Sequence, residues 1–266
     1  MPGRPYPRSG AVLSRDQLDR WSRRGPLREF LDYYCLRDVV LGPTQHGPDD
    51  FRGDTIDLNL YAVANGGGAS VASYAINTQN NGVIRATTGT ANDATASASI
   101  VTPEQYYGDL NCMCEIRHAG ITAVTDVRIE TGFSDDVPDS NAAHVNSLTT
   151  PTVNATVVDA VLDVFNHSSS TVTNTFITIG SSIDAIDTAF TAPVTLVAAT
   201  FILTRIMVFG NYAVLWRDGR LVAENGKGTD AVEGGSAMAW TAYIGALSAT
   251  SKSHDIDYRL TAQNRA

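Results

Sequence analysis

Alternation of apolar and polar residues, repeated in many short segments, constrains the fold of this chain more than any other feature. Residues 127–131, 172–178 and 255–260 alternate in this way, and residues 201–209 are apolar on both faces except at Arg205. A period of two is typical of β-strands, because successive side chains point to opposite faces. Short segments of this kind, joined by Gly, Asn, Asp and Ser, predict an all-β protein with an antiparallel β-sandwich or jelly roll.

Two further segments refine this prediction. Asp218 and Gly219 lie between two apolar runs, and the pair favours a two-residue hairpin turn because both positions need positive φ. We expect the flanking Arg217 and Arg220 to be solvated. Residues 156–168 fit either a helix or a strand by spacing, and their β-branched side chains favour a strand.

The first 41 residues differ from the rest in charge and composition. They carry eight arginines against five acidic residues, a net charge of +3, whereas the remainder carries eleven basic against twenty-three acidic residues, a net charge of −12. Ser14 and Gln17 form a capping box that predicts a short helix. We therefore expect a basic, Pro-rich arm with short helical segments at 1–41 and a β-sandwich domain at 42–266.

The arm has two interpretations. It is either a solvated terminus or a tether whose arginines make charge-assisted contacts with an acidic partner surface. We favour the tether, and the acidic remainder argues against a nucleic-acid partner. A second helical spacing in the arm is formed by Leu27, Phe30, Leu31 and Tyr34. The expected partner contacts are Arg4, Arg8, Arg15, Arg20, Trp21, Arg23, Arg24 and Arg28.

Membrane and disulfide patterns are missing from the sequence. No segment is long and apolar enough for a spanning helix, and the N-terminal residues do not resemble a signal peptide. We therefore expect synthesis in a cytoplasm and no membrane partner. Cys35, Cys112 and Cys114 suit neither a disulfide framework nor a zinc site. On a strand, Cys112 and Cys114 would share one face, where we expect them to be buried.

Catalytic motifs are equally sparse. Nucleophile elbows, P-loops and dinucleotide fingerprints do not occur in the sequence. A glycosidase would need two carboxylates at a defined separation. The nearest candidates, Asp255 and Asp257, alternate with apolar residues and are expected on the solvent face of an edge strand. Glu115 and Glu130 each stand without a close acidic partner, so we predict no enzyme activity and no cofactor.

Two weaker patterns in the sequence concern ligand binding. Asp135, Asp136 and Asp139 could gather a calcium ion, but an acidic loop that contains proline is more often a solvated turn. The five histidines are scattered, so no metal site is predicted. Three aromatic residues could stack on a sugar, although packing in a core or interface is the commoner role of such residues. These residues are Tyr212, Trp216 and Trp240.

Several motifs in order resemble structural proteins of tailed bacteriophages. The first is the run NNGVIRATTGTANDATASASI at 80–100, followed by an E-x-R strand at Glu115–Arg117. The strand and loop VRIETGFSDDVPDS, the hairpin VLWRDGRLVAE and the final DIDY follow. The resemblance covers residues 50–260, consists of strand and turn residues, and has no counterpart of the arm. It implies a concanavalin A-like jelly roll that decorates, cements or forms fibres on a virion.

The resemblance sets the functional expectations. The first is a non-enzymatic virion protein, namely a capsid decoration or cement protein that docks on the major capsid protein, or on other virion proteins, through its arm and a sandwich edge. A homo-oligomer is expected, and a trimer would suit a symmetry axis. The alternative is a carbohydrate-binding module on a phage head or tail fibre that recognises host surface glycans. A glycoside hydrolase or lyase ranks third.

Overall fold

The computed structural model describes most of the chain after residue 50, together with residues 40 and 41. The described residues are 40–41, 51, 55–66, 71–77, 82–90, 96–120, 124–136, 143–147, 152–153, 157–168, 171–179, 185–189, 196–209, 212–225 and 236–263. The expected arm contacts from Arg4 to Arg28 lie outside this set, and the boundary after residue 41 stays a prediction. In the described parts of the chain, no helix has the length and apolar character needed to cross a membrane.

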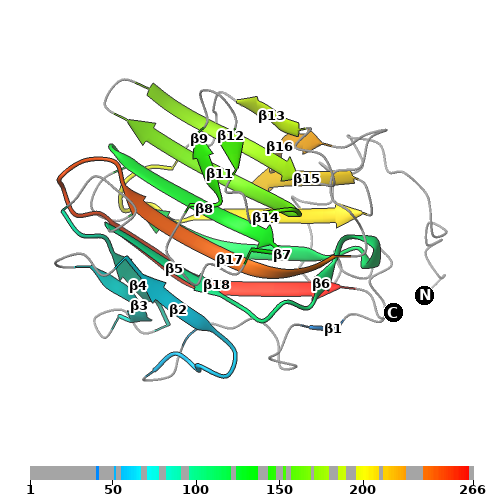
Figure 1. Cartoon of the computed structure of the whole chain (residues 1–266), viewed down its shortest axis with the longest axis horizontal. Coiled ribbons are helices and arrows are strands. Elements are labelled where there is room, and N and C mark those ends of the chain that lie inside the picture. Colours follow the sequence, from blue (N-terminus) through cyan, green and yellow to red (C-terminus); the bar gives the residue numbers. More distant parts are fainter. Residues whose placement is uncertain are drawn as a thin grey trace, which may run out of the picture.

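Two eight-stranded antiparallel sheets form the body of the protein (Figure 1). Sheet A has the order β16-β15-β14-β7-β18-β4-β3, and β1 also pairs with β18. Its strands are β1 (Val40–Leu41), β3 (Ala72–Ile76), β4 (Ile84–Thr87), β7 (Met113–Gly120), β14 (Ile202–Phe209), β15 (Tyr212–Arg217), β16 (Arg220–Asn225) and β18 (Ser253–Gln263).

Sheet B has the order β13-β12-β11-β8-β17-β5-β2, and β6 pairs with β17. Its strands are β2 (Ala62–Asn65), β5 (Ser97–Val101), β6 (Tyr106–Tyr107), β8 (Val127–Ser134), β11 (Ala160–Ser168), β12 (Thr171–Ile179), β13 (Ala185–Ala189) and β17 (Ala237–Ala246). A separate pair joins β9 (Val145–Ser147) to β10 (Thr152–Val153), and a short 3-10 helix spans Gly108–Leu110.

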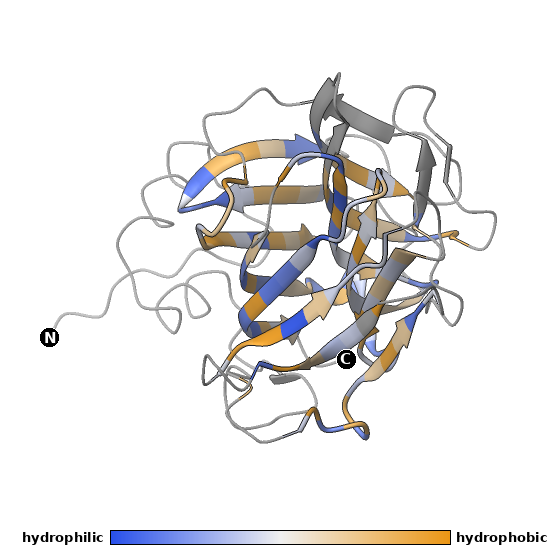
Figure 2. Cartoon of the chain, turned by 90° about the vertical axis from the view of Figure 1, so that its left-hand side faces the viewer, coloured by the Kyte–Doolittle hydropathy of each residue, from blue (hydrophilic) through white to orange (hydrophobic). Residues whose placement is uncertain are grey.

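One apolar interior lies between the two sheets. It forms because alternate side chains of each strand point the same way, and Figure 2 shows the resulting alternation of hydrophobic and hydrophilic residues along the strands. Sheet A contributes Ile116, Ile206 and Ile256, and sheet B contributes Phe133 and Trp240. Cys112 and Cys114 lie in the same cluster as free thiols, and burial raises the pKa of both.

The predicted sandwich is confirmed, and so are several of its elements. The ambiguous segment at 156–168 contains a strand, β11, and the strand predicted at 201–209 is β14. Asp218 and Gly219 join β15 to β16 with φ values of 46° and 72°, as the hairpin prediction requires. The Asp218 side chain also accepts a hydrogen bond from the Leu203 N–H at 2.9 Å, which ties the hairpin to β14.

One strand is placed differently from the prediction. The final DIDY segment was expected at a sheet edge, but β18 lies in the middle of sheet A between β7 and β4. Asp255 is fully buried there and is bound to Arg85, with an Nε–Oδ1 distance of 2.6 Å. Alternation alone cannot distinguish a solvent-facing carboxylate from one that is neutralised by an arginine on the next strand.

Candidate functional site

The candidate site is the outer face of sheet B, which points away from sheet A. In β17, Trp240 and Ala242 belong to the interior cluster, so Thr241 and Tyr243 point outward. The same alternation in β8 places Glu130 on the outer face. This face is built from residues that are far apart in the sequence, because neighbouring strands of sheet B are seldom consecutive in the chain.

Pairing between the strands shows how the outer face is composed. Two cross-strand rows run from β2 to β12, namely Ala62–Val101–Thr241–Gly132–Leu162–Ile177 and Ala64–Ser99–Tyr243–Glu130–Val164–Thr175. The half near β2 and β5 has small side chains. The half near β11 and β12 is apolar, with Leu162, Val164 and Ile177 buried in a cluster separate from the interior.

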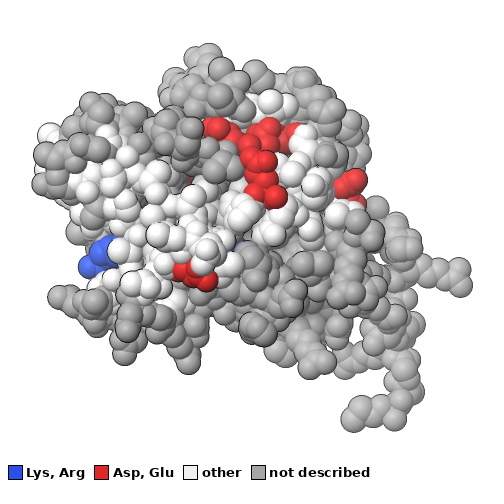
Figure 3. All heavy atoms as spheres, turned by 60° about the horizontal axis from the view of Figure 1, so that its bottom comes forward, with Lys and Arg blue, Asp and Glu red and all other residues white. Residues whose placement is uncertain are grey.

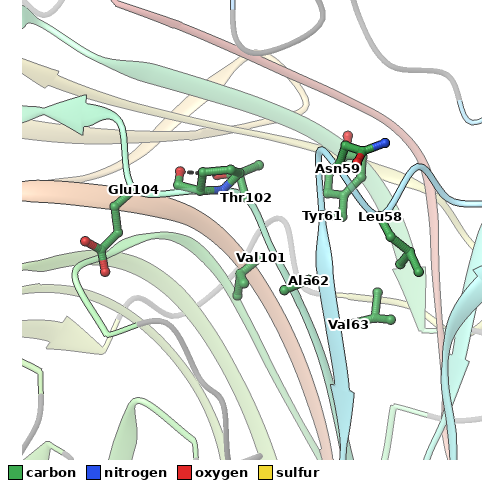
Figure 4. Close-up of a pocket in the computed structure, with 9 residues that line it drawn as sticks. Leu58, Asn59, Tyr61, Ala62, Val63, Val101, Thr102 and Glu104 are labelled. Carbon is green, nitrogen blue, oxygen red and sulfur yellow. Dashed lines mark hydrogen bonds between the residues drawn. The ribbon is translucent and has the colours of Figure 1, made fainter.

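An open hollow of about 580 Å³ lies at the β2 and β5 end of sheet B. It is lined by Leu58, Asn59, Tyr61, Ala62, Val63, Val101, Thr102, Pro103 and Glu104. In Figure 4, Glu104 and Asn59 lie on opposite sides of this group, with Val101 and Ala62 between them. The hollow therefore combines an apolar lining with an amide and a carboxylate, which is the usual composition of a small-molecule site.

A tight turn before β2 holds Asn59 at the hollow. The Asp57 carboxylate accepts hydrogen bonds from the backbone N–H and from the side-chain amide of Asn59, both at 2.9 Å. The Asp57 carbonyl accepts from the N–H groups of Leu60 and Tyr61. Asp and Asn favour such turns because their short side chains bond to nearby backbone. The turn leaves the Leu58 side chain 71% exposed beside the hollow.

A buried Glu–His pair lies further along the outer face. Glu130 Oε2 accepts hydrogen bonds from the His144 backbone N–H and pairs with the His144 ring Nδ1, each at 2.9 Å. Glu130 Oε1 is 3.9 Å from the Arg128 guanidinium, which is an ion-pair distance but too long for a hydrogen bond. Glu130 and His144 are both fully buried.

Several polar atoms on this face are buried without a hydrogen bond. In the described part of the chain, the atoms that lack a hydrogen-bond partner here are Glu130 Oε1, His144 Nε2, Thr241 Oγ1 and Thr175 Oγ1. We call these four residues the polar strip. Native proteins pair most buried polar atoms, because an unpaired one costs about 1–3 kcal/mol. Thr241 is the neighbour of Val101, so the polar strip begins next to the hollow.

Tyr243 lies next to Glu130 of the polar strip, and its side chain packs closely on the neighbouring backbone. Its side chain extends across Gly245, where a Cβ atom would come within 2.5 Å of the Tyr243 hydroxyl. Burial, followed by the nearby Glu130 charge, raises the pKa of Tyr243 to about 12. The phenol therefore stays protonated near neutral pH and keeps a hydrogen-bond donor on this face.

Sheet A presents a different outer face, on which each of three carboxylates faces an arginine. Arg205 donates to Glu115, Arg85 donates to Asp255, and Arg117 pairs with Asp257. Figure 3 shows one face of the whole molecule, on which the described acidic side chains lie over the upper middle, at the right and at the lower centre, and the described basic atoms lie mainly at the left. The strand prediction treated Arg205 as a polar exception, yet it is buried against Glu115.

The predicted sugar-stacking platform does not form. Trp240 is fully buried in the interior, and Trp216 is 1% exposed on the outer face of sheet A. Tyr212 is half-buried and donates a hydrogen bond to Glu224 at 2.7 Å. The two tryptophans belong to different sheets, and both rings are covered, so they cannot offer a free face to a common ligand.

Arg217 also differs from the expectation that it is solvated. It reaches from β15 into the interior, where it donates to the Asp163 carboxylate and, at 2.9 Å, to Asn174 Oδ1. Arg220, on the other side of the turn, is exposed as expected. The face-to-face packing of the two sheets thus brings together Arg217 and Asp163, and no local pattern in the sequence connects these two residues.

Two of the scattered histidines meet in the interior. His118 Nδ1 and His254 Nε2 are 2.9 Å apart, and the chain of hydrogen bonds continues to the Tyr74 hydroxyl at 2.5 Å and to Thr204 Oγ1 at 3.0 Å. Burial lowers the pKa of His254 to about 3 and also lowers that of His118. Two charged imidazoles could not share this site, so both rings are neutral.

The acidic segment considered for calcium is described only in part. Asp135 accepts a hydrogen bond from the Val158 N–H at 3.0 Å, and Asp136 follows it, whereas Asp139 lies outside the described residues. No group of three or more His, Cys, Asp or Glu side chains that could hold a metal ion occurs among the described residues.

Comparison with known proteins gives a clear result for the fold only. The sequence matches no protein-family model and no curated protein sequence. Many solved structures are similar, among them the carbohydrate recognition domain of Emp47p, at 10% identity and a TM-score of 0.57, with 85% of this chain and 97% of that chain covered.

Two further solved structures have a similar fold. The catalytic domain of an endo-1,3-beta-glucanase (laminarinase) from Thermotoga petrophila RKU-1 has 13% identity and a TM-score of 0.52, with 82% of this chain and 97% of that chain covered. LamAcat from Zobellia galactanivorans has 11% identity and a TM-score of 0.55, with 81% and 96% covered. The chain therefore has the antiparallel two-sheet sandwich fold of concanavalin A-like jelly rolls.

Proposed function

We propose that this chain is a carbohydrate-binding domain whose ligand site is the hollow at the β2 and β5 end of sheet B. The observation that carries the proposal is the composition of this hollow, in which apolar side chains lie beside an amide and a carboxylate. Val101 lines the hollow and pairs with Thr241, the first member of the strip. The similar fold of the Emp47p carbohydrate recognition domain supports the proposal at the level of fold.

The chemistry of the hollow suits a sugar. A sugar ring presents an apolar face of C–H groups and a rim of hydroxyl groups, so a matching site needs apolar lining and a few fixed polar groups. Val63 and Val101 supply apolar surface, and Asn59 and Glu104 supply an amide and a carboxylate. The Thr241 hydroxyl next to Val101 has no hydrogen-bond partner, but it is fully buried, so the polar contacts of a ligand in the hollow fall to Asn59, Thr102 and Glu104.

Binding without hydrolysis fits the described carboxylates better than catalysis does. Hydrolysis needs one carboxyl group to donate a proton and a second to act as base or nucleophile. Glu115, Asp163 and Asp255 are each held by an arginine, and Glu130 is held by His144. Such pairing occupies the carboxylate oxygens and fixes them in place, so these four groups are not positioned against a glycosidic bond.

The proposal is tested by screening the full chain on a glycan array and measuring affinity for the bound glycans by calorimetry. We expect Asn59→Ala/Glu104→Ala to abolish binding and leave the unfolding midpoint unchanged. Arg220→Ala, at the exposed hairpin tip of sheet A, is the matched control and should bind normally. A folded chain that binds no glycan on the array would refute the proposal, and release of soluble sugar would replace it with a hydrolase.

A virion docking role is the second candidate, and the path of the chain into sheet A favours it. β1 pairs with β18 through Val40–Gln263 and Leu41–Ala262, so the basic arm joins the body at sheet A, away from the proposed sugar site. One molecule could then hold a capsid or other virion protein with its arm and keep sheet B free for a glycan. The negative net charge of the remaining residues would complement a basic arm on a neighbouring copy.

This second role is tested with phage particles that lack the protein. We expect the full chain to bind such particles as a homo-oligomer, and the chain that lacks residues 1–39 to lose binding. Circular dichroism and the unfolding midpoint serve as controls for the fold of the shortened chain. Full occupancy by the shortened chain would exclude an anchoring role for the arm.

A further inference from the structure

Hydrogen-bond donors are largely used up at the hollow of sheet B, whereas acceptors are left free. The backbone N–H groups of Asn59 and Tyr61 are bonded to Asp57, and that of Thr102 is bonded to the Trp240 carbonyl. The Thr102 hydroxyl accepts from the Trp240 backbone N–H at 2.9 Å and donates to the next backbone carbonyl at 3.2 Å. Its proton is thus in use, and a ligand can only donate to its oxygen.

Two exposed carboxylates and an amide add to this acceptor capacity. The Glu104 carboxylate lines the hollow, and no described residue forms a hydrogen bond or ion pair with it. Asn59 directs one amide N–H to Asp57 Oδ1 at 2.9 Å, which leaves the Asn59 carbonyl oxygen for a ligand. Asp57 receives both bonds from Asn59 on the same oxygen, so its other oxygen is a further acceptor at the margin of the hollow. An ionised carboxylate only accepts hydrogen bonds.

The charged groups that a ligand can reach at the hollow are acidic. None of the nine described residues that line it is basic. Arg259 approaches from the interior, where its guanidinium lies 5.0 Å from the centre of the Tyr61 ring. Arg259 is only 1% exposed, so it offers no N–H group to a ligand in the hollow. The chain from residue 42 onward has a net charge of −12, which also favours a cationic ligand.

A ligand that complements this lining carries a positive charge and donates hydrogen bonds. An ammonium group has three N–H donors and no acceptor, and its bonds to a carboxylate are about twice as strong as neutral ones. A sugar with a free amino group combines this cation with a face of C–H groups that matches Val63 and Val101. Acidic sugars would place a second negative charge beside Glu104.

We propose that the hollow binds an oligosaccharide of amino sugars, with a ligand ammonium paired to Glu104 and a ligand donor bonded to the Asn59 carbonyl oxygen. Glu104 and Asn59 lie on opposite sides of the lining (Figure 4), so the two contacts fall on different parts of the ligand. This inference rests on the proposed carbohydrate-binding function and names the class of sugar that the same site takes.

The test compares two ligands that differ only in charge, a glucosamine tetramer and the same tetramer with every amine acetylated. We expect calorimetry on the full chain to show about fivefold tighter binding of the free amine, as one partly exposed charge pair contributes. Glu104→Gln keeps the shape of the side chain and should bring the ratio of the two affinities close to one. Asp109→Asn removes the same charge from an exposed residue outside the hollow and should keep the ratio. The unfolding midpoint confirms that both variants are folded.

The possible failures separate this inference from the proposed function. Equal affinity of the unmodified chain for the two tetramers, or binding of other glycans alone, would overturn the ammonium contact and leave a sugar site. An unchanged ratio in folded Glu104→Gln would overturn the pairing with Glu104. A lysine tetramer that competes as strongly as the glucosamine tetramer would assign the preference to general charge attraction and refute an amino-sugar site. A chain that binds no glycan at all would refute the proposed function together with this inference.

Discussion

The two sheets bury their polar groups in opposite ways. On the outer face of sheet A, Glu115 is bound by Arg205 and also accepts a hydrogen bond from Tyr258 at 2.7 Å. On the outer face of sheet B, Glu130 has one carboxylate oxygen with no hydrogen bond, and the Thr241 hydroxyl has none. On this face of sheet A the described buried carboxylates Glu115 and Asp255 are thus each paired with an arginine, whereas sheet B keeps unused hydrogen-bonding capacity next to a hollow.

This difference assigns the two sheets different roles, one in the stability of the fold and one in ligand binding. A carboxylate that is already paired with an arginine gains little from a polar ligand, because its oxygens are already used. A face with unpaired groups is less stable by itself and gains hydrogen bonds when a polar ligand arrives. The contrast suggests that sheet A maintains the fold and that sheet B carries the site, and the following substitutions test it.

The largest effect is expected for Glu115→Ala on sheet A. The change leaves the buried Arg205 guanidinium without its carboxylate, and loss of one partner of a buried pair costs about 3–5 kcal/mol. Urea unfolding followed by circular dichroism measures the loss. Asp257→Ala is the matched control on the same face, because the Arg117–Asp257 pair is partly exposed and should contribute about 1 kcal/mol or less. Equal losses for the two variants would contradict the comparison.

Acid should weaken the histidine pair of sheet A. Both His118 and His254 have a pKa below the usual value of about 6.5 in the folded state, so the unfolded chain binds protons more readily. Their contribution is complete above pH 6.5 and is lost as the pH falls toward 3, by about 1.4 kcal/mol per pH unit for each histidine.

The measurement for this prediction is the free energy of unfolding between pH 7 and pH 5. The unmodified chain should lose more stability over this range than His118→Gln/His254→Gln, in which no proton can bind at the site. Identical pH profiles for the two chains would show that the pair does not titrate on unfolding.

The smallest effect is expected from a matched pair of threonines. Thr204 on sheet A bonds to His118, and Thr241 on sheet B has no hydrogen-bond partner, although both are fully buried. Thr204→Val should cost about 1 kcal/mol through the lost hydrogen bond, whereas Thr241→Val should be neutral or stabilising by up to about 1 kcal/mol. Thermal unfolding ranks the two. A larger loss of stability for Thr241→Val than for Thr204→Val would contradict the view that the two sheets differ in how they satisfy their buried polar groups.

Strands and turns were predictable where a short segment contains a characteristic residue pattern. The β15–β16 turn follows from Asp218-Gly219, and β14 follows from the alternation at residues 201–209. The interior position of Arg217 was not predictable, because its partner Asp163 is 54 residues away and lies on the other sheet. The hollow was missed for the same reason, since residues 58–63 and 101–104 form it only when β2 pairs with β5.

Local sequence patterns are sufficient to show that the chain forms β-strands, where many of them lie, and which of their faces are apolar. These properties depend on neighbouring residues, because side-chain direction repeats every two positions along a strand. Which strands are neighbours follows from the three-dimensional fold, and with it the burial of Asp255 in a central strand and the position of Thr241 next to Val101, which lines the hollow. Strand order is set by contacts between distant segments, and a period of two carries no information about them.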